Sequence, residues 1–164
     1  MLLYKKYLPD FIFGGIDGLV TTFAVVSGVI GASLPSSVIL ILGFANLFAD
    51  GFSMAVSNYL SSKSEEDLQQ NHSDKKATKA ALTTFVAFIL IGFIPLLSFV
   101  INFGERNFLI SIILTLLAFS LVGYIKGYVT KTNRLVSILQ TLFVGSLAAI
   151  IAYMVGYWLA DFGV

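Results

Sequence analysis

Long apolar runs alternate with short polar segments along this chain. A helix needs roughly 20 mostly apolar residues to cross the hydrocarbon core of a bilayer. Five runs meet this requirement, at about residues 11–31, 37–60, 79–101, 107–128 and 135–160. A chain of 164 residues cannot bury five such helices in a soluble core. The pattern therefore predicts an all-α integral membrane protein, with five transmembrane helices in a single domain over residues 1–164.

The composition agrees with this prediction and excludes other classes. Hydrophobic residues make up 57% of the chain and charged residues 12%, whereas soluble domains carry about 25% charged residues. The net charge of +1 gives no field that would attract nucleic acid. The chain has no Cys and a single His, so the usual nucleophilic and metal-hydrolase constellations are missing. We therefore expect neither an enzyme nor a bound cofactor.

The basic residues predict the orientation of the helices. With the five runs as spans, every Lys and Arg except Arg106 falls on the side of the N-terminus. Cytoplasmic loops carry an excess of Lys and Arg. The N-terminus should therefore be cytoplasmic and the C-terminus outside or luminal. A multi-pass protein of this kind belongs in the cell membrane of a prokaryote or in a vacuolar-type membrane of a eukaryote.

The polar segment 62–78 is predicted to be a short cytoplasmic loop that extends the second helix by one or two turns. It is too short to fold as a domain. Runs of charge are usually solvated, which favours a plain solvated turn. The alternative is a metal contact formed by acidic residues and the only histidine, namely Glu65, Glu66, Asp67, His72 and Asp74.

Two acids interrupt the first two apolar runs. An aspartate near the centre of a membrane helix costs roughly 2.5–3.5 kcal/mol on insertion scales, so a carboxylate there needs a partner. If the first two spans form a hairpin centred near Leu34, Asp17 lies at the depth of Gly51. Asp17 and Asp50 should therefore be nearly level, with Asp17 roughly 10 Å inside its helix.

Polar side chains also follow one face of the second span. Residues four apart stay within a narrow stripe of a helix, and that stripe contains Asn46, Asp50, Met54 and Asn58. Opposite Asp17 and Thr21, it would form a polar track. A structural alternative is a protonated aspartate that bonds Asn46 or Thr21 and holds the helices together. Ionisable groups at membrane depth favour an ion pathway, and this ligand set suits Fe²⁺ or Mn²⁺ better than Ca²⁺.

A carboxylate that releases an ion can take up a proton, which makes proton antiport simple to build. Small residues four apart, as in Gly14-xxx-Gly18 and Gly145-xxx-Ala149, allow close helix packing. Since a single protomer would supply only half of an enclosed track, we expect a homodimer.

The segments "DGLVTTFAVVSGVIGA" and "LGFANLFADGFSMAVSNYLS" resemble the vacuolar iron transporter family over the whole chain. The resemblance implies a homodimeric five-helix carrier that moves Fe²⁺, and often Mn²⁺, out of the cytosol in exchange for protons. It also implies that Asp17 and Met54 take the places of the family's pathway aspartate and methionine.

The chain departs from the family pattern at two places. Iron transporters of the family typically have an acid directly before the tyrosine that follows "SMA", where this chain has Asn58 before Tyr59. Asp50 then supplies a carboxylate two turns earlier. Many members also insert a metal-binding domain between spans two and three, where this chain has only the segment 62–78. Two other functions stay open: a divalent cation channel, and a membrane assembly protein that transports nothing.

Overall fold

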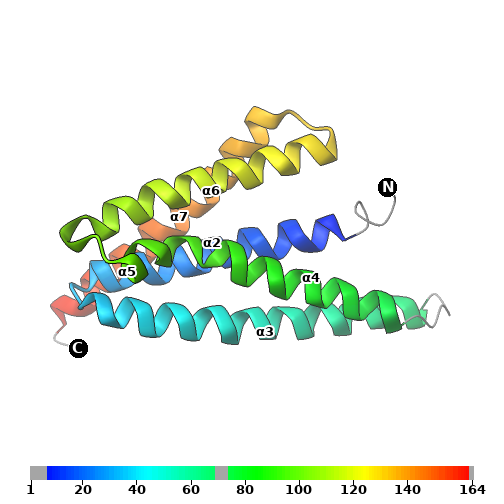
Figure 1. Ribbon diagram of the computed structural model, residues 1–164, viewed down its shortest axis with the longest axis horizontal. Coiled ribbons are helices and arrows are strands. Elements are labelled where there is room, and N and C mark those ends of the chain that lie inside the picture. The colour runs from blue at the N-terminus through cyan, green and yellow to red at the C-terminus, as the bar shows by residue number, and fades with distance from the viewer. Residues whose placement is uncertain (1–6, 69–73, 163–164) are drawn as a thin grey trace.

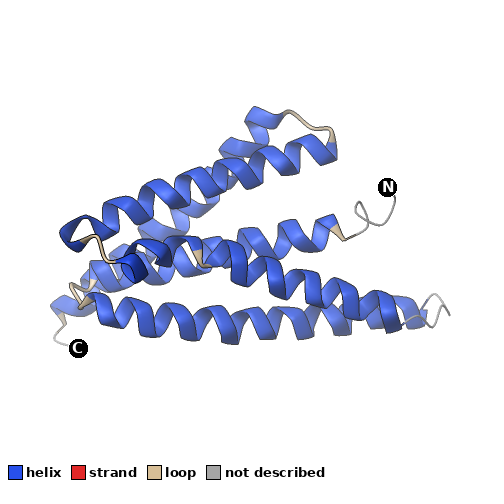
Figure 2. Ribbon diagram, viewed as in Figure 1, coloured by secondary structure: helices blue, strands red, loops and turns tan. Residues whose placement is uncertain are grey.

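The computed structural model describes residues 7–68 and 74–162, which form helices and short connections without any strand (Figure 2). With the labels of Figure 1, the long helices are α2 (Leu8–Gly31), α3 (Ser36–Leu68), α4 (Asp74–Gly92), α6 (Asn107–Thr130) and α7 (Arg134–Asp161). A short 3₁₀ turn η1 (Ile94–Leu96) and helix α5 (Leu97–Ile101) continue the path of α4, and the turn η2 (Gly104–Arg106) precedes α6.

Five helical segments are long and apolar enough to cross a membrane, which confirms the predicted fold class. Their outer surfaces are apolar: Ile41, Leu139 and Phe143 are 68%, 65% and 69% exposed. Exposed apolar surface on this scale is rare on soluble monomers and is typical of helices that face lipid. The chain is therefore a multi-pass integral membrane protein.

Helix α2 occupies the centre of the molecule, with the pair α3 and α4 on one side and the pair α6 and α7 on the other (Figure 1). The start of α2 and the connections α3–α4 and α6–α7 lie at one end of the long axis. The end of α7 lies at the other. We call the first end the inner end and the second the outer end. Most of the predicted loop 62–78 is helical, because α3 extends to Leu68 and α4 begins at Asp74.

The third span differs from the uninterrupted helix that its hydropathy suggests. Helix α4 ends at Gly92, just before Pro95, and the chain continues as a 3₁₀ turn and then as α5. Proline has no N–H to donate and clashes with the preceding turn, so it interrupts a helix. The buried hydroxyl of Ser111 donates to the carbonyl oxygen of Pro95 at 2.7 Å, which ties the break to α6.

Glycines set the packing distance between α2 and its neighbours. A Cβ on Gly18 would come within 2.5 Å of the carbonyl oxygen of Phe88 on α4. Near the outer end, Gly31 meets the backbone of Tyr153 and Gly156 meets that of Gly28, so α2 and α7 are equally close. Gly18, one of the small residues four apart in the sequence, thus serves a contact within one protomer.

Candidate metal pathway

Helices α2 and α3 form an antiparallel hairpin around the turn that includes Ser33, which adopts a positive φ of 55°. Three pairs of polar residues lie across from each other on the two helices, in sequence from the outer to the inner end. These pairs are Thr21 with Asn46, Asp17 with Asp50, and Asp10 with Asn58. The members of each pair are nearly equidistant from Leu34. The register predicted from the hairpin is therefore present in the structure.

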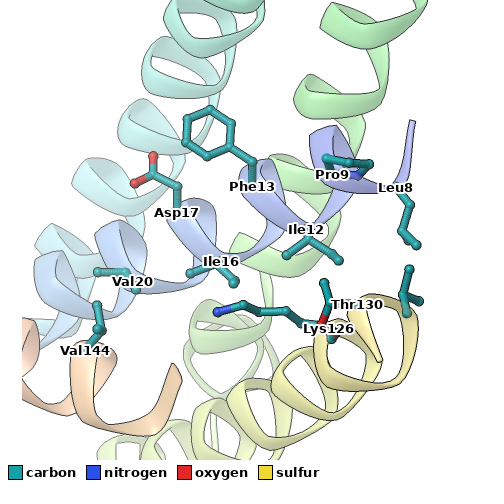
Figure 3. Close-up of a pocket in the computed structure, with 11 residues that line it drawn as sticks. Leu8, Pro9, Ile12, Phe13, Ile16, Asp17, Val20, Lys126, Thr130 and Val144 are labelled. Carbon is teal, nitrogen blue, oxygen red and sulfur yellow. Dashed lines mark hydrogen bonds between the residues drawn. The ribbon is translucent and has the colours of Figure 1, made fainter. Parts of the chain in front are cut away.

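The two acids lie at the same level of this hairpin. Asp17 and Asp50 are both half-buried, and they are near enough for their charges to repel each other. In Figure 3 the carboxylate of Asp17 points toward α3. One turn further out, the Asn46 amide donates to the hydroxyl of Thr21 at 3.5 Å, and that hydroxyl donates to the backbone oxygen of Asp17 at 2.9 Å. Repelling carboxylates in an apolar surrounding favour a bound cation.

Asn58 has a different environment from the other members of its stripe. Its side-chain amide donates to the Asp10 carboxylate at 2.8 Å and to the Thr84 hydroxyl at 2.6 Å. Its carbonyl oxygen accepts from Ser62 at 3.2 Å, and the Thr84 hydroxyl donates to the backbone oxygen of Asp10 at 3.4 Å. This network joins α2, α3 and α4 near the inner end. A glutamate in place of Asn58 would set a second carboxylate against Asp10, whereas the amide donates to it.

Asp10 is the polar residue that the sequence reasoning missed. It lies in the first turn of α2, where acids are common, so its position in the sequence did not indicate a functional role. The register of the hairpin could have indicated this pairing, because Asp10 and Asn58 are equidistant from Leu34. The polar track therefore extends from Asn46 to Asp10 and contains three carboxylates.

Met54 faces the apolar core. It is half-buried and packs against a cluster that includes Leu47 and Phe88. The reason lies in the helical period: Gly43, Leu47 and Gly51 form the buried face of α3, and Met54 follows them on that face. The structure thus places Met54 one turn from Asp50, in apolar surroundings.

The acidic residues Glu65, Glu66 and Asp67 lie on the last turns of α3, while His72 lies outside the described residues. Within residues 7–68 and 74–162, no three His, Cys, Asp or Glu side chains gather into a metal-binding group. One protomer thus offers an ion at the level of Asp17 two carboxylates and few other oxygens. Hard divalent ions require about six ligands.

The model of the VIT family matches residues 8–77 and 67–157. The two matched segments overlap over residues 67–77, which include the connection between α3 and α4.

Three relatives show similarity over most of the chain. It is 30% identical to Vacuolar iron transporter 1 of Tulipa gesneriana, over 88% of this chain and 83% of the relative. The chain is 27% identical to Vacuolar iron transporter 1 of Arabidopsis thaliana, over 90% of this chain and 84% of the relative. The chain is 25% identical to the Vacuolar iron transporter of Plasmodium berghei, over 94% of this chain and 82% of the relative. The tulip alignment extends over 206 positions, so the relative carries residues that this chain lacks.

Proposed function

Because this chain belongs to the VIT family and is therefore a membrane transporter of metal ions, we propose that it exports Fe²⁺ or Mn²⁺ from the cytosol in exchange for protons. The ion passes along the hairpin of α2 and α3. The observation that carries this proposal is the pair Asp17 and Asp50, two level carboxylates within mutual repulsion at membrane depth.

The remaining polar residues extend this pair into a pathway. Asp10, held by Asn58, offers a carboxylate near the inner end, and the Asn46 amide lies one turn beyond the pair. An ion from the cytosol would meet Asp10 first and then the pair, with Asn46 next. Oxygen ligands of this kind suit Mn²⁺. Fe²⁺ also binds sites that combine such oxygen ligands with softer donors. Met54 is the softer donor closest in sequence to Asp50.

A homodimer would complete the ligand set. Two carboxylates and an amide from one protomer leave a divalent ion short of ligands, and the polar track lies beside the exposed side chain of Phe13 on α2. A second copy related by a two-fold axis, the commonest symmetry of homo-oligomers, would supply the same groups again.

Proton exchange is expected because the pair Asp17 and Asp50 is energetically unfavourable when no metal ion is bound between them. When the ion leaves, two repelling carboxylates stay behind in a medium of low dielectric constant, where an unpaired charge is expensive. Protonation removes that cost. The two carboxylates would therefore bind the ion and protons alternately.

The test is metal flux into proteoliposomes that contain the purified protein. We expect wild type to move Fe²⁺ and Mn²⁺, and we expect Asp17→Asn to reduce flux to the level of empty liposomes while the melting temperature is kept. Asp161→Asn at the exposed end of α7 makes the same chemical change outside the track and should keep full flux. An Asp17→Asn protein with normal flux would show that the pathway is placed wrongly.

The same vesicles separate an antiporter from a channel. An outwardly or inwardly directed proton gradient should change the wild-type flux, and Asp50→Asn should slow all divalents and weaken that dependence. Flux that ignores the proton gradient in wild type would indicate a channel for divalent cations. No flux of either metal under any gradient would favour the assembly protein.

A further inference from the structure

A groove of about 510 Å³ opens on the side of α2 that faces α6 and α7. Figure 1 shows why: near the inner end, the hairpin of α6 and α7 diverges from α2, whereas near the outer end α7 packs tightly on it. The lining is almost wholly apolar. Beyond the charged and hydroxyl groups, it consists of Leu8, Pro9, Ile12, Phe13, Ile16, Val20, Val129 and Val144.

The lining of this groove includes one cation, Lys126, and one anion, Asp17. Lys126 extends from α6 into the space beside α2 and lies close to Ile16 (Figure 3). Asp17 lies at the edge of the groove, with its carboxylate pointing away from Lys126 toward α3. Among residues 7–68 and 74–162, no acidic side chain forms an ion pair with Lys126. Its ammonium group is therefore available to an anion that enters from outside the protein.

The depth of Lys126 is marked by its neighbours. The guanidinium of Arg134 lies 5.3 Å from the ring centroid of Tyr124 and 5.1 Å from that of Tyr128, and it donates to the Tyr124 hydroxyl at 3.2 Å. Tyrosine gathers at the headgroup level of a bilayer. Lys126 lies between these two tyrosines on the same helix end, so its backbone is near headgroup level. Its ammonium extends inward to about the level of Ile16 (Figure 3), and a lysine side chain of this length can also extend back to the interface.

We propose that this groove binds one anionic phospholipid of the inner leaflet. The phosphate pairs with Lys126 near Thr130, and an acyl chain lies along Ile12, Ile16 and Val20. Three features favour this occupant: a free ammonium on a side chain long enough to reach headgroup level, an apolar lining that continues inward past Ile16 to Val20 and Val144, and the divergence of α6 and α7 from α2 at the inner end (Figure 1). Basic pockets between membrane helices on the cytoplasmic side bind anionic headgroups in this way. A polar solute would gain nothing from the apolar lining.

Native mass spectrometry of the purified protein with equal amounts of phosphatidylglycerol and phosphatidylcholine tests the proposal. We expect wild type to retain the anionic lipid preferentially, and Lys126→Gln to lower that preference about fivefold, as expected for one basic residue near a membrane surface. Lys131→Asn removes the same charge from the exposed connection one turn away, where the residue has a positive φ that asparagine tolerates, and should keep most of the preference. Equal losses in the two variants would overturn the site.

A second measurement distinguishes the lipid from a second copy of the chain. The sequence has no cysteine, so Val129→Cys introduces a single thiol in the groove. Anionic lipid should slow its reaction with a maleimide in detergent, phosphatidylcholine should not, and Leu121→Cys on the exposed face of α6 should be insensitive to both. Protection in lipid-free detergent, or a disulfide between two protomers, would assign the groove to a partner protomer and overturn the proposal.

Discussion

Residues of one stripe on α3 have different surroundings, although they look alike in the sequence. Asn46 and Asp50 face α2, Met54 faces the apolar core, and Asn58 donates to both α2 and α4. A residue type at a four-residue spacing predicts a face of a helix. It does not predict which helix that face meets.

Met54 provides a test of the ion preference at the residue scale. Met54→Leu keeps size and hydrophobicity, so a side chain that packs against Leu47 and Phe88 should lose less than about 1.5 kcal/mol of stability. If the thioether also contacts the ion, Fe²⁺ flux should fall relative to Mn²⁺ flux, because sulfur prefers softer ions. The measurement is the ratio of the two fluxes in proteoliposomes. An unchanged ratio would limit Met54 to packing.

Asn58 should matter for stability more than for ion choice. Asn58→Leu removes the amide that donates to the half-buried Asp10 carboxylate and to the Thr84 hydroxyl, and each such hydrogen bond contributes about 0.5–1.5 kcal/mol of net stability. Ser62→Ala removes only the 3.2 Å bond to Asn58 and serves as the control. Thermal unfolding in detergent should show a clearly lower midpoint for Asn58→Leu than for Ser62→Ala. Similar midpoints would mean that the network does not hold α2, α3 and α4 together.

At the scale of the helices, α2 is the element on which the others depend. Glycines bring it against α4 at one end and against α7 at the other. In the sequence, small residues four apart were compatible equally with packing inside a protomer and with packing between protomers. The pattern shows that a close approach takes place, and only the structure shows which helix approaches.

Gly18→Ala tests this close packing. Its new methyl group would meet the Phe88 carbonyl oxygen, a backbone atom that cannot rotate away. Overpacking of this kind costs about 1–3 kcal/mol. Gly28→Ala is the matched control on the same helix, since its Cβ would be 3.4 Å from the nearest atom, an ordinary contact. Thermal unfolding should therefore show a lower midpoint for Gly18→Ala alone, and equal midpoints would contradict the role of Gly18.

The break in the third span shows where hydropathy stops being informative. The run 79–101 is apolar throughout, so its composition predicts one spanning segment and nothing about its interior. Pro95 interrupts the helix because it lacks a donor. The carbonyl oxygen of Pro95 accepts the Ser111 hydroxyl from α6, a contact between residues that no local pattern connects.

For the whole molecule, the sequence was sufficient for the five spans and for the register of the first hairpin. Both depend on simple counting, one of apolar residues and the other of distances from Leu34. The central place of α2 and the core position of Met54 were not predictable in this way. They depend on which helices pack together, and an apolar surface is equally suited to lipid and to another helix.

A homodimer is the prediction at this scale. The protomer has a mass of 17.8 kDa, and native mass spectrometry in mild detergent should show twice that value, because one protomer offers too few ligands at the level of Asp17. Co-expression of two differently tagged copies should give co-purification, whereas mixing them after solubilisation should give much less. A stable monomer that transports metal would contradict this prediction.

The network of Asp10, Asn58 and Thr84 also has a consequence for protein engineering. It fastens the inner ends of α2, α3 and α4 to one another through side chains, so the chain between α3 and α4 does not have to hold these helices in register. The entropic cost of lengthening a connection grows only slowly with its length, and the two segments that match the family model overlap at this connection. A fluorescent protein inserted after Leu68 should therefore leave the transmembrane helices folded and metal flux intact, which would give a fluorescently labelled carrier that still transports.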